Sequence, residues 1–422
     1  MPLDIAYAVN LLRYAAESSA AILQYMRFMR PIRAFAVVVA LIVALAPSHA
    51  RAQSTGVVFL DRNANGVRDR GEPGIGGVVV SNQVDVVATD VTGHYTLGAG
   101  GRGMTFVSLP RGHRVAGSWW KVTPAGGTVD FGLTPNREPV PYTFAQASDT
   151  HISPTSAPRT RRMVSMVDSI KPSLLIITGD LVRDALRVGE AEATGYYQLF
   201  NDEMRALRTP VVTVPGNHEN FGIERAKSQV STSHPLYGRA MYHKFRGPDY
   251  YSFNAAGVHF VALNSVDIDD QSYYGHVDSV QVAWLRRDLA LVPDSVPVVT
   301  FNHIPMASMA EGLNGPMEGV APSLITINGK PQYRHTVSNV GDVLAALGAH
   351  RWEIALGGHV HYRETLALDL GGKHIRFHQT GAIVGDGGAG PFTLPSSITV
   401  YTIRNGVVDD GRVVLLGKVP PG

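Results

Sequence analysis

The chain of 422 residues contains no cysteine. This absence excludes disulfide bonds, thiolate nucleophiles and thiolate metal sites, so any metal ligand must be an imidazole, a carboxylate or an amide. Charge is also scarce, because Asp, Glu, Lys and Arg make up 17% of the residues and the formal net charge is +2. No strong field attracts nucleic acid or an anionic membrane, so neither is an expected partner. The length suffices for two domains.

The first 52 residues are predicted to form a leader that is removed from the mature protein. Several arginines between positions 27 and 33 precede the apolar stretch 34–46, and a small-x-small cleavage site ends at Ala52. This order is typical of a secretory signal peptide. A membrane anchor is the alternative, but a span needs about 20 apolar residues and this run is shorter. Acidic residues near the N-terminus favour a translation start at Met26 or Met29, and the mature protein is expected to be secreted or periplasmic, without a transmembrane segment.

Residues 53–138 are rich in glycine and in short β-branched runs. Close spacing of such runs, interrupted by Gly and Asp turns, predicts a small all-β sandwich domain. The expected strands are 57–60, 77–81, 84–89, 94–97 and 104–109.

One turn of this region, residues 61–72, matches the twelve-residue calcium loop. Such a loop needs side-chain oxygens at positions 1, 3, 5, 9 and 12, a backbone carbonyl at 7 and glycine at 6. The residues predicted to bind a structural calcium ion are Asp61, Asn63, Asn65, Val67 through its carbonyl, Asp69 and Glu72. The flanks read as strands, so the segment is no EF-hand, and it resembles the B-type repeats of bacterial surface adhesins. The alternative is an Asx-rich turn closed by its own hydrogen bonds.

A polar segment with two prolines, 134–139, marks the boundary to a second domain at 141–418. There, apolar strand-like runs alternate with helical patterns, such as the amphipathic stretch 193–207. This alternation predicts an α/β fold. The expected strands are 142–147, 174–177, 211–214, 258–263, 296–301 and 354–356, with helices near 281–291 and 337–347, and with strands alone after residue 361 at 365–370, 374–379, 398–403 and 407–416.

Five polar blocks follow apolar runs in this second domain. They are Asp149-Thr-His151, Gly179-Asp180, Gly216-Asn217-His218-Glu219, His303 and Gly358-His359-Val-His361. In open α/β sheets, ligands bind outside the carboxyl ends of the strands, so blocks that are distant in sequence can meet at one rim. A single block of this kind is usually a turn, but all five in this position predict one site.

The blocks supply ligands for two hard cations, such as Mn, Fe or Zn. One arrangement places Asp149, His151 and His361 on the first ion, Asn217, His303 and His359 on the second, and the carboxylate of Asp180 on both. Two ions about 3.5–4 Å apart can clamp a phosphoryl group and activate a water as nucleophile. His218 is left over, and could stabilise developing charge or protonate the leaving oxygen as the catalytic residue.

In this order the blocks resemble the signature of the calcineurin-like metallophosphoesterase superfamily, over residues 143 to about 405. The resemblance implies two packed mixed β-sheets flanked by helices, the same seven ligands, and the role of His218. Together with the first domain, it points to a secreted bacterial type with an N-terminal transthyretin-like domain.

Two departures from the family limit what can be carried over. The Asp that orients the catalytic histidine in Ser/Thr protein phosphatases is not matched after Asp180. Glu219 stands where Asp is commoner, as in purple acid phosphatases, but their metal-binding tyrosine block is missing. Protein phosphatase activity is therefore not expected. The first block, Asp149-Thr-His151, instead favours the diesterase-like branches of the superfamily.

We therefore expect a phosphoester hydrolase in which a metal-activated hydroxide attacks the phosphorus of a small phosphodiester or phosphomonoester. A nucleotidase or an acid-phosphatase-like monoesterase is one alternative. The other is a non-catalytic cell-surface binding protein that uses the fold as a scaffold, which the adhesin-like first domain suggests.

A second set of polar and aromatic residues could line the substrate cleft. These candidates are Arg183, Asp184, Glu219, Tyr273 and Tyr274, and the glycine-rich loop 381–390 is either a cover for the site or an ordinary surface loop. The histidines outside the blocks are expected to be surface or core residues: His113, His234, His243, His259, His276, His335, His350, His374 and His378.

Cleavage of the leader is directly testable. The chain, expressed in a bacterium with an intact export pathway, should give a mature protein that begins at Gln53, because the small-x-small site ends at Ala52. N-terminal sequencing of the exported protein measures this. A product that keeps residues 34–46 would favour the membrane anchor instead.

Overall fold

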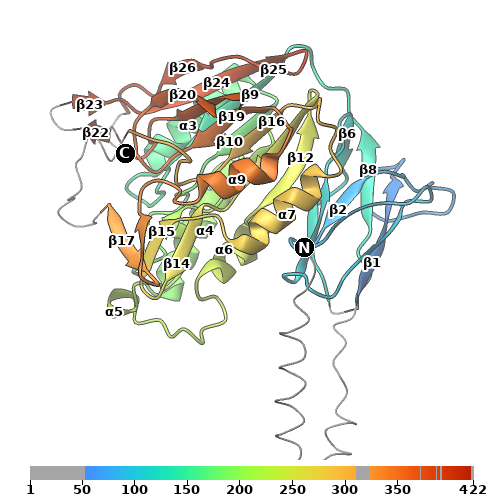
Figure 1. The fold of residues 1–422 in the computed structure, drawn as a ribbon, viewed down its shortest axis with the longest axis horizontal. Coiled ribbons are helices and arrows are strands. Elements are labelled where there is room, and N and C mark those ends of the chain that lie inside the picture. Colours follow the sequence, from blue (N-terminus) through green and yellow to red (C-terminus); the bar gives the residue numbers. More distant parts are fainter. Residues whose placement is uncertain are drawn as a thin grey trace, which may run out of the picture. The chain divides into compact units, whose positions relative to one another are not determined.

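Figure 1 shows the chain in a computed structural model, which describes residues 53–419 apart from 125, 310–322, 371, 386, 390 and 391. The predicted signal peptide, 1–52, lies outside the described residues. The described residues from 53 onward belong to one compact unit. Within the described ranges, no helix has the length and apolar character that a bilayer crossing requires.

The first region is a sandwich of two four-stranded sheets, with orders β4-β1-β8-β6 and β3-β2-β5-β7. The strands are β1 (Ser54–Leu60), β2 (Val79–Ser81), β3 (Val86–Ala88), β4 (His94–Leu97), β5 (Met104–Ser108), β6 (His113–Val115), β7 (Trp120–Val122) and β8 (Phe131–Pro135). Inward apolar side chains such as Val58, Val80 and Phe131 are fully buried between them. The all-β prediction is confirmed, although β6, β7 and β8 were not among the expected strands.

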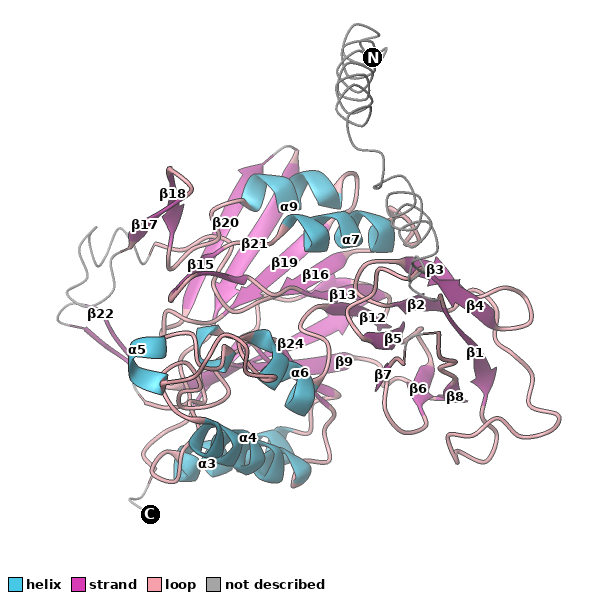
Figure 2. Cartoon of the chain, turned by 90° about the horizontal axis from the view of Figure 1, so that it is seen from below, coloured by secondary structure: helices cyan, strands magenta, loops and turns pink. Residues whose placement is uncertain are grey.

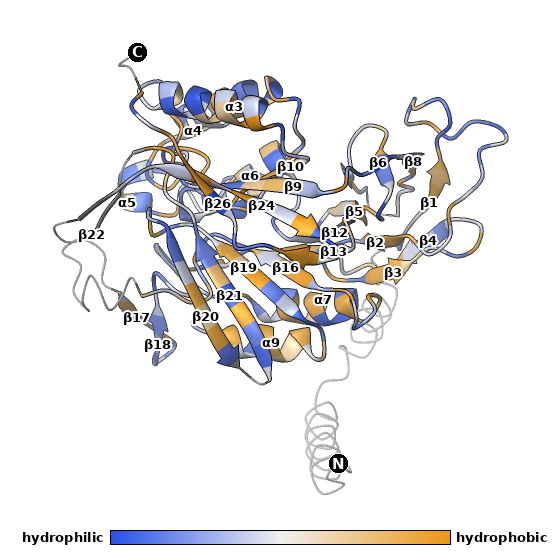
Figure 3. Ribbon diagram, turned by 90° about the horizontal axis from the view of Figure 1, so that it is seen from above, coloured by the Kyte–Doolittle hydropathy of each residue, from blue (hydrophilic) through white to orange (hydrophobic). Residues whose placement is uncertain are grey.

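The second region contains two six-stranded mixed sheets. The first has the order β11-β10-β9-β24-β25, with β26 also pairing β24: β9 (Tyr142–Ala147), β10 (Leu174–Ile177), β11 (Val211–Thr213), β24 (Ser397–Arg404), β25 (Val407–Val408) and β26 (Arg412–Leu415). The second has the order β12-β13-β16-β19-β21-β20: β12 (Tyr251–Ala255), β13 (Val258–Ala262), β16 (Val298–Phe301), β19 (Trp352–Gly357), β20 (Glu364–Leu370) and β21 (Lys373–Gln379). Figure 3 shows hydrophilic and hydrophobic segments along β20 and β21, at the edge of this sheet.

Parallel pairing within each sheet brings strand ends to a common rim. Strands β9, β10 and β11 are mutually parallel neighbours, as are β13, β16, β19 and β21 in the other sheet. Side chains from both sheets, such as Phe144 and Phe260 in edge-to-face contact at 5.5 Å, share one core. The carboxyl ends of these strands can therefore present residues to the same site.

Helices cover the outer faces (Figure 2). Helices α3 (Ala157–Ile170) and α4 (Glu190–Arg205) pack their apolar stripes on the first sheet, and α7 (Ser279–Leu289) and α9 (Val340–Leu347) pack on the second. The smaller elements are η2 (Asn217–Glu219), α5 (Arg225–Ser228), α6 (Arg239–Arg246) and the hairpins β14 (Val266–Asp269)–β15 (Ser272–Gly275), β17 (Leu324–Ile327)–β18 (Lys330–Tyr333) and β22 (Gly387–Ala389)–β23 (Phe392–Leu394). The predicted α/β architecture of two packed mixed sheets flanked by helices is confirmed.

The sandwich is fused to the second region through apolar packing. Phe106 belongs to the same buried cluster as the second sheet and lies edge-on to Tyr251 and Trp284. Trp119 contacts Tyr251 with ring centroids 4.5 Å apart. Since a shared core resists separation, the two regions support each other rather than swinging on a linker.

Buried polar contacts reinforce this junction. The side-chain amide of Gln83 donates to Oδ1 of Asp249 at 2.8 Å, and both residues are fully buried. Burial alone would raise the pKa of Asp249, but the charges of His243 and Arg239 hold it well below its usual range. A buried carboxylate with such partners is costly to disturb, because losing one leaves the others uncompensated.

The predicted calcium loop is closed by its own hydrogen bonds. Asp61 accepts from the backbone N–H of Asn65 and Gly66 at 3.2 and 2.7 Å, and Glu72 accepts from that of Asp69 at 2.9 Å. Within the described residues, groups of three or more metal-binding side chains within 4.8 Å occur only around the five polar blocks, so the loop's carboxylates do not form one. This geometry agrees with the Asx-rich turn, and calcium binding stays a prediction that requires the side-chain amides to turn away from Asp69.

Calcium binding predicts a ligand-dependent melting temperature. Calcium at about tenfold above its Kd should stabilise the parent by about 1.4 kcal/mol, and chelator should reverse this. Asp61→Ala should abolish the response. Differential scanning fluorimetry with calcium and with chelator measures it.

The matched control is Asp90→Ala, because Asp90 closes an ordinary Asx turn by accepting from the backbone of Thr92 and His94. That variant should keep the calcium response. If neither calcium nor chelator changes the melting temperature of the parent, the loop is an Asx-rich turn that does not bind calcium.

Candidate active site

Each polar block follows a strand of one of the two large sheets. Asp149 comes after β9, Asp180 after β10, and Asn217 after β11 on the short helix η2. His303 comes after β16, and His359 after β19. The first sheet therefore supplies the carboxylates and the amide, and the second supplies three of the imidazoles.

The backbone is left-handed at five of the seven predicted ligands. The φ angles are 54° at Asp149, 38° at His151, 49° at Asp180, 70° at His359 and 64° at His361. For residues with a Cβ this conformation costs roughly 1–2 kcal/mol each. Such clustering of unfavourable backbone is characteristic of functional sites, where side-chain aim outweighs local stability.

Two glycines of the blocks are required by close approach. A Cβ on Gly216 would lie 2.1 Å from Oδ1 of Asp180, and a Cβ on Gly358 would lie 1.9 Å from the hydroxyl of Ser148. No real Cβ tolerates these distances. The glycines therefore let neighbouring loops pack against the carboxylates.

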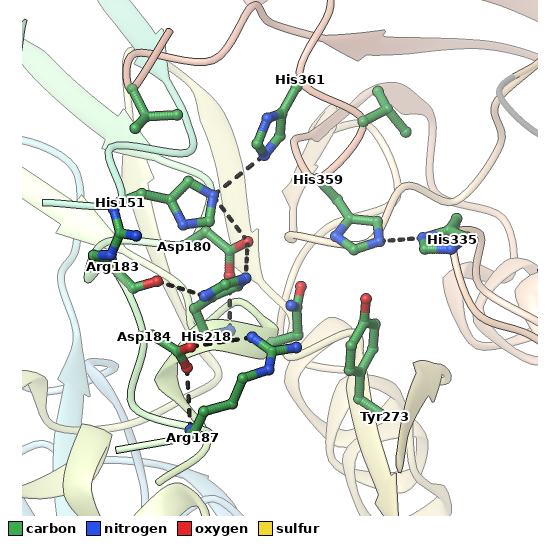
Figure 4. Close-up of a pocket in the computed structure, with 13 residues that line it drawn as sticks. His151, Asp180, Arg183, Asp184, Arg187, His218, Tyr273, His335, His359 and His361 are labelled. Carbon is green, nitrogen blue, oxygen red and sulfur yellow. Dashed lines mark hydrogen bonds and ion pairs between the residues drawn. The ribbon is translucent and has the colours of Figure 1, made fainter. Parts of the chain in front are cut away.

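The structure brings the predicted ligands together in two groups that share Asp180. Figure 4 shows four of them, His151, Asp180, His359 and His361, at the cavity. The first group is Asp149, His151, Asp180 and His361, with one ligand atom of each within 4.8 Å of the others. Nε2 of His151 lies 3.2 Å from Nε2 of His361 and 3.5 Å from Oδ2 of Asp180. Oδ1 of Asp149 lies 3.3 Å from Nε2 of His361.

The second group is Asp180, His303 and His359, and Asn217 lies beside it. Nε2 of His303 lies 3.2 Å from Oδ2 of Asp180, from Oδ1 of Asn217 and from Nδ1 of His359. All seven predicted ligands are thus gathered at one place.

These spacings fit metal coordination. Two ligands about 2.1 Å from one ion, at an angle near 100°, are separated by about 3.2 Å, which is the spacing found around His303. In addition, Oδ1 of Asp149 is buried and accepts no hydrogen bond. A buried carboxylate oxygen that accepts no hydrogen bond is costly unless a cation balances its charge, and here its ion-pair partner is the ring of His361 at 3.3 Å. The arrangement could therefore hold two metal ions.

The pKa shifts of these imidazoles are compatible with metal binding. Burial, aided by the charge of His218, lowers the pKa of His151 to about 3, and burial likewise lowers that of His359. Burial opposes protonation of His303, yet the charge of Asp180 raises its pKa to about 9. Neutral imidazoles offer lone pairs, and cation binding at His303 would displace a proton.

His218 stands beside these groups without belonging to either. Its Nδ1 lies 2.6 Å from the carbonyl oxygen of Arg183 and donates to it, which leaves Nε2 on the cavity side, 4.0 Å from Oδ2 of Asp180. The orienting group that the sequence did not reveal is therefore a main-chain carbonyl.

Glu219 lies beneath the site rather than in it. Its Oε2 accepts from the backbone N–H of Asp180 and Gly216, and its Oε1 from those of Leu181 and Val182, at 2.6–3.0 Å. Burial and the charge of Asp180 raise the pKa of Glu219, whereas these N–H donors favour its ionised form. One carboxylate thereby fixes the turns that carry Asp180 and the η2 helix.

A cavity of about 580 Å³ opens over the two groups. Arg183, Asp184 and Tyr273 line it, as proposed from the sequence. Tyr274 does not line it, because its hydroxyl turns away to donate to Asp267 at 3.2 Å. Sequence reasoning missed Arg187, which lies four residues after Arg183 in the non-helical segment before α4 and also lines the cavity.

The prediction that His335 is a surface or core histidine is wrong. This side chain lines the cavity, and its Nδ1 lies 2.7 Å from Nε2 of His359 (Figure 4). It reaches the site because the loop after β18 turns back across the rim. The predicted cover loop 381–390 lies partly outside the described residues; its Val384 lines the cavity and donates its N–H to the carbonyl of Asp149.

The role of Glu219 predicts an unusual sensitivity to an isosteric change. Glu219→Gln should destabilise the metal-free protein by about 2–4 kcal/mol, because its amide NH₂ must face two backbone N–H donors in either orientation. Urea unfolding in the presence of chelator measures this.

The control is Glu203→Gln, which removes a surface ion pair with Arg161. It should cost no more than about 1 kcal/mol. Equal effects of the two substitutions would show that the backbone donors do not depend on the charge of Glu219.

Comparison with known proteins agrees with this geometry. A calcineurin-like phosphoesterase family model matches residues 142–363. A 3',5'-cyclic adenosine monophosphate phosphodiesterase of Escherichia coli K12 is 22% identical over 222 residues, which are 50% of this chain and 63% of that protein. A serine/threonine-protein phosphatase of Bos taurus is 31% identical over 144 residues, which are 32% of this chain and 41% of that protein. The chain thus spans less than two thirds of either relative.

Two solved structures also match parts of the chain. A dimetal phosphatase from Danio rerio has a TM-score of 0.41 and 16% identity, over 65% of this chain and 96% of that one. A purple acid phosphatase from yellow lupin has a TM-score of 0.44 and 13% identity, over 80% of this chain and 68% of that one. The family model covers more than half of the 422 residues of this chain. The chain therefore belongs to the calcineurin-like phosphoesterases.

Proposed function

We propose that the chain is a secreted or periplasmic two-metal hydrolase of small phosphate esters, with phosphodiesters as the first candidates. The observation that carries the proposal is the pair of ligand groups that share Asp180 on the floor of the cavity. The cavity volume of about 580 Å³ lies within the range of small-molecule sites, about 300–1,000 Å³.

In this proposal seven residues hold the metals. Asp149, His151 and His361 would hold one ion, Asn217, His303 and His359 the other, and Asp180 both. Nitrogen and oxygen ligands in these numbers suit Mn, Fe or Zn. When bound, such ions supply Lewis acidity that neutralises phosphoryl charge and lowers the pKa of a water.

His218 is the proposed catalytic residue. The carbonyl of Arg183 accepts its Nδ1–H and so fixes the ring, while Nε2 faces the cavity. As the water oxygen bonds to phosphorus, the P–O bond to the leaving group breaks, and the proton on Nε2 passes to the leaving oxygen. The attacking water loses a proton to solvent, and the neutral His218 that remains takes up a proton from solvent, so that it again carries protons on both Nδ1 and Nε2.

Charges at the rim support a singly charged ester. Arg187 pairs with Asp184 at 3.1 Å and with Glu224 at 2.6 Å, so much of its charge is neutralised. Arg183 is exposed at the rim. The two arginines are thus balanced by the two carboxylates, and a phosphodiester with one negative charge suits a rim with little net positive charge better than a monoester with two. The name of the Escherichia coli relative, a cyclic-nucleotide phosphodiesterase, points the same way.

Two other functions stay as alternatives. A nucleotidase or acid-phosphatase-like monoesterase would use the same ligands on a different ester. A non-catalytic cell-surface protein would use the fold for binding, as the adhesin-like first region suggests. The complete ligand set argues against the second alternative, because binding alone does not require it.

The proposal predicts turnover that depends on Asp180 and His218. Manganese-loaded parent protein should hydrolyse bis(4-nitrophenyl) phosphate and 3',5'-cyclic adenosine monophosphate faster than 4-nitrophenyl phosphate. Asp180→Asn should lose bound metal and turnover together, whereas His218→Ala should keep both ions and lose about 10²–10⁴-fold in rate. Steady-state kinetics and metal content measure this.

A leaving-group series sharpens the assignment of His218. If it protonates the leaving oxygen, His218→Ala should slow alkyl esters more than 4-nitrophenyl esters, whose leaving group needs little protonation. His374→Ala is the control, because His374 lies exposed beside Asp369. No turnover by the parent with Mn, Fe, Co or Zn would favour the binding protein. A monoester preference would favour the phosphatase, and metal loss in His218→Ala would make that residue a ligand.

A further inference from the structure

His335 and His359 form a contact that the five sequence blocks do not contain. His335 follows strand β18 and places its Nδ1 2.7 Å from Nε2 of His359, with the two ring planes only 20° apart (Figure 4). Both side chains line the cavity. The contact is therefore a short nitrogen-to-nitrogen hydrogen bond between nearly parallel rings, at the edge of the second ligand group.

This bond determines which nitrogen of His359 is available to a cation. Nδ1 of His359 lies 3.2 Å from Nε2 of His303, inside the ligand group, and Nε2 points to His335. A neutral imidazole carries one proton. If His335 accepts the proton on Nε2, the lone pair of His359 must lie on Nδ1, where the ion would be.

The loop that carries His335 is held from two sides. Val337 donates its N–H to the carbonyl of Pro305 at 2.9 Å, and Ser338 donates to that of Gly275 at 2.8 Å. These bonds tie the loop to the segment after β16 and to the end of β15. His335 is thus presented to His359 by a fixed backbone.

Two of the other nearby imidazoles are oriented by the main chain. Nδ1 of His303 lies 2.7 Å from the carbonyl of Thr178, and Nδ1 of His218 lies 2.6 Å from that of Arg183. At His359 a side chain has this function. A substitution can therefore remove the orienting group without changing any ligand.

We propose that His335 is a positioning residue, which fixes the tautomer and ring orientation of His359 so that Nδ1 faces the second metal ion. The proposal rests on the function proposed above. Partners of this kind typically contribute about 10–100-fold to metal affinity. His335 then acts on one of the two sites only, because the first group does not contain His359.

Three substitutions test the proposal by metal binding rather than turnover. His335→Asn retains a polar group close to the position of Nδ1, His335→Gln extends its amide beyond it, and His335→Ala removes the group. Calorimetric titration with Mn²⁺ alone should show two ions bound to the parent. The Ala and Gln variants should bind one ion normally and the other about 10–100-fold more weakly. The Asn variant should recover most of this loss, and Mn²⁺ electron paramagnetic resonance should lose its coupled-pair spectrum only in the Ala and Gln variants.

Several outcomes overturn the proposal. Parent-like affinities in all three variants would mean that His335 does not orient His359. Equal weakening at both sites, or no recovery in the Asn variant despite parent-like melting in chelator, would mean a general structural role. If the Ala variant does not fold, the comparison of Asn with Gln decides. A parent that binds fewer than two ions, or an Asp180→Asn variant that binds both, would instead refute the proposed function.

Discussion

The site depends on the placement of one buried carboxylate, that of Asp180. Its Oδ1 accepts the backbone N–H of His218 at 2.9 Å, and its Oδ2 lies 3.2 Å from His303 of the other sheet. This position requires a left-handed backbone, a glycine at 216 and the bonds to Glu219 that hold the turn. Because Asp180 follows β10 of the first sheet and His303 follows β16 of the second, the two sheets must meet at one rim. The strands, the helices that cover them and the fused sandwich serve to keep that rim rigid.

Much of this arrangement was predictable from the sequence. The segment from Tyr142 to Ala147 matches β9. The continuous apolar run from Leu174 to Ile177 matches β10, because such a run suits a strand buried on both faces. Polar blocks directly after such strands predicted convergence, and Asp180 and His303 do converge. Sequence reasoning succeeded where one local pattern determines both the element and the point at which it ends.

The remainder depends on contacts between segments that are distant in sequence. The loop that holds His335 reaches His359 through bonds to β15 and β16, and no local pattern encodes that return. Glu219 looked like a cleft residue because its sequence neighbours are ligands, but its side chain points under the turn. The sandwich read as a separate domain because its strands are locally complete, although Phe106 is buried in the core of its neighbour. Such placements are consequences of packing, which a single sequence does not display.

The division of the ligands between the sheets has a mechanical consequence. In the proposed set, each ion is held by residues from both sheets: Asp149 and His361 on one, Asn217 and His359 on the other. Each ion would then be a cross-link that closes a loop of more than about 100 residues, in a chain that contains no cysteine. Unlike a disulfide, this cross-link forms and breaks with the concentration of free metal. The stiffness of the seam between the sheets would thus report the metal supply of the compartment in which the protein resides.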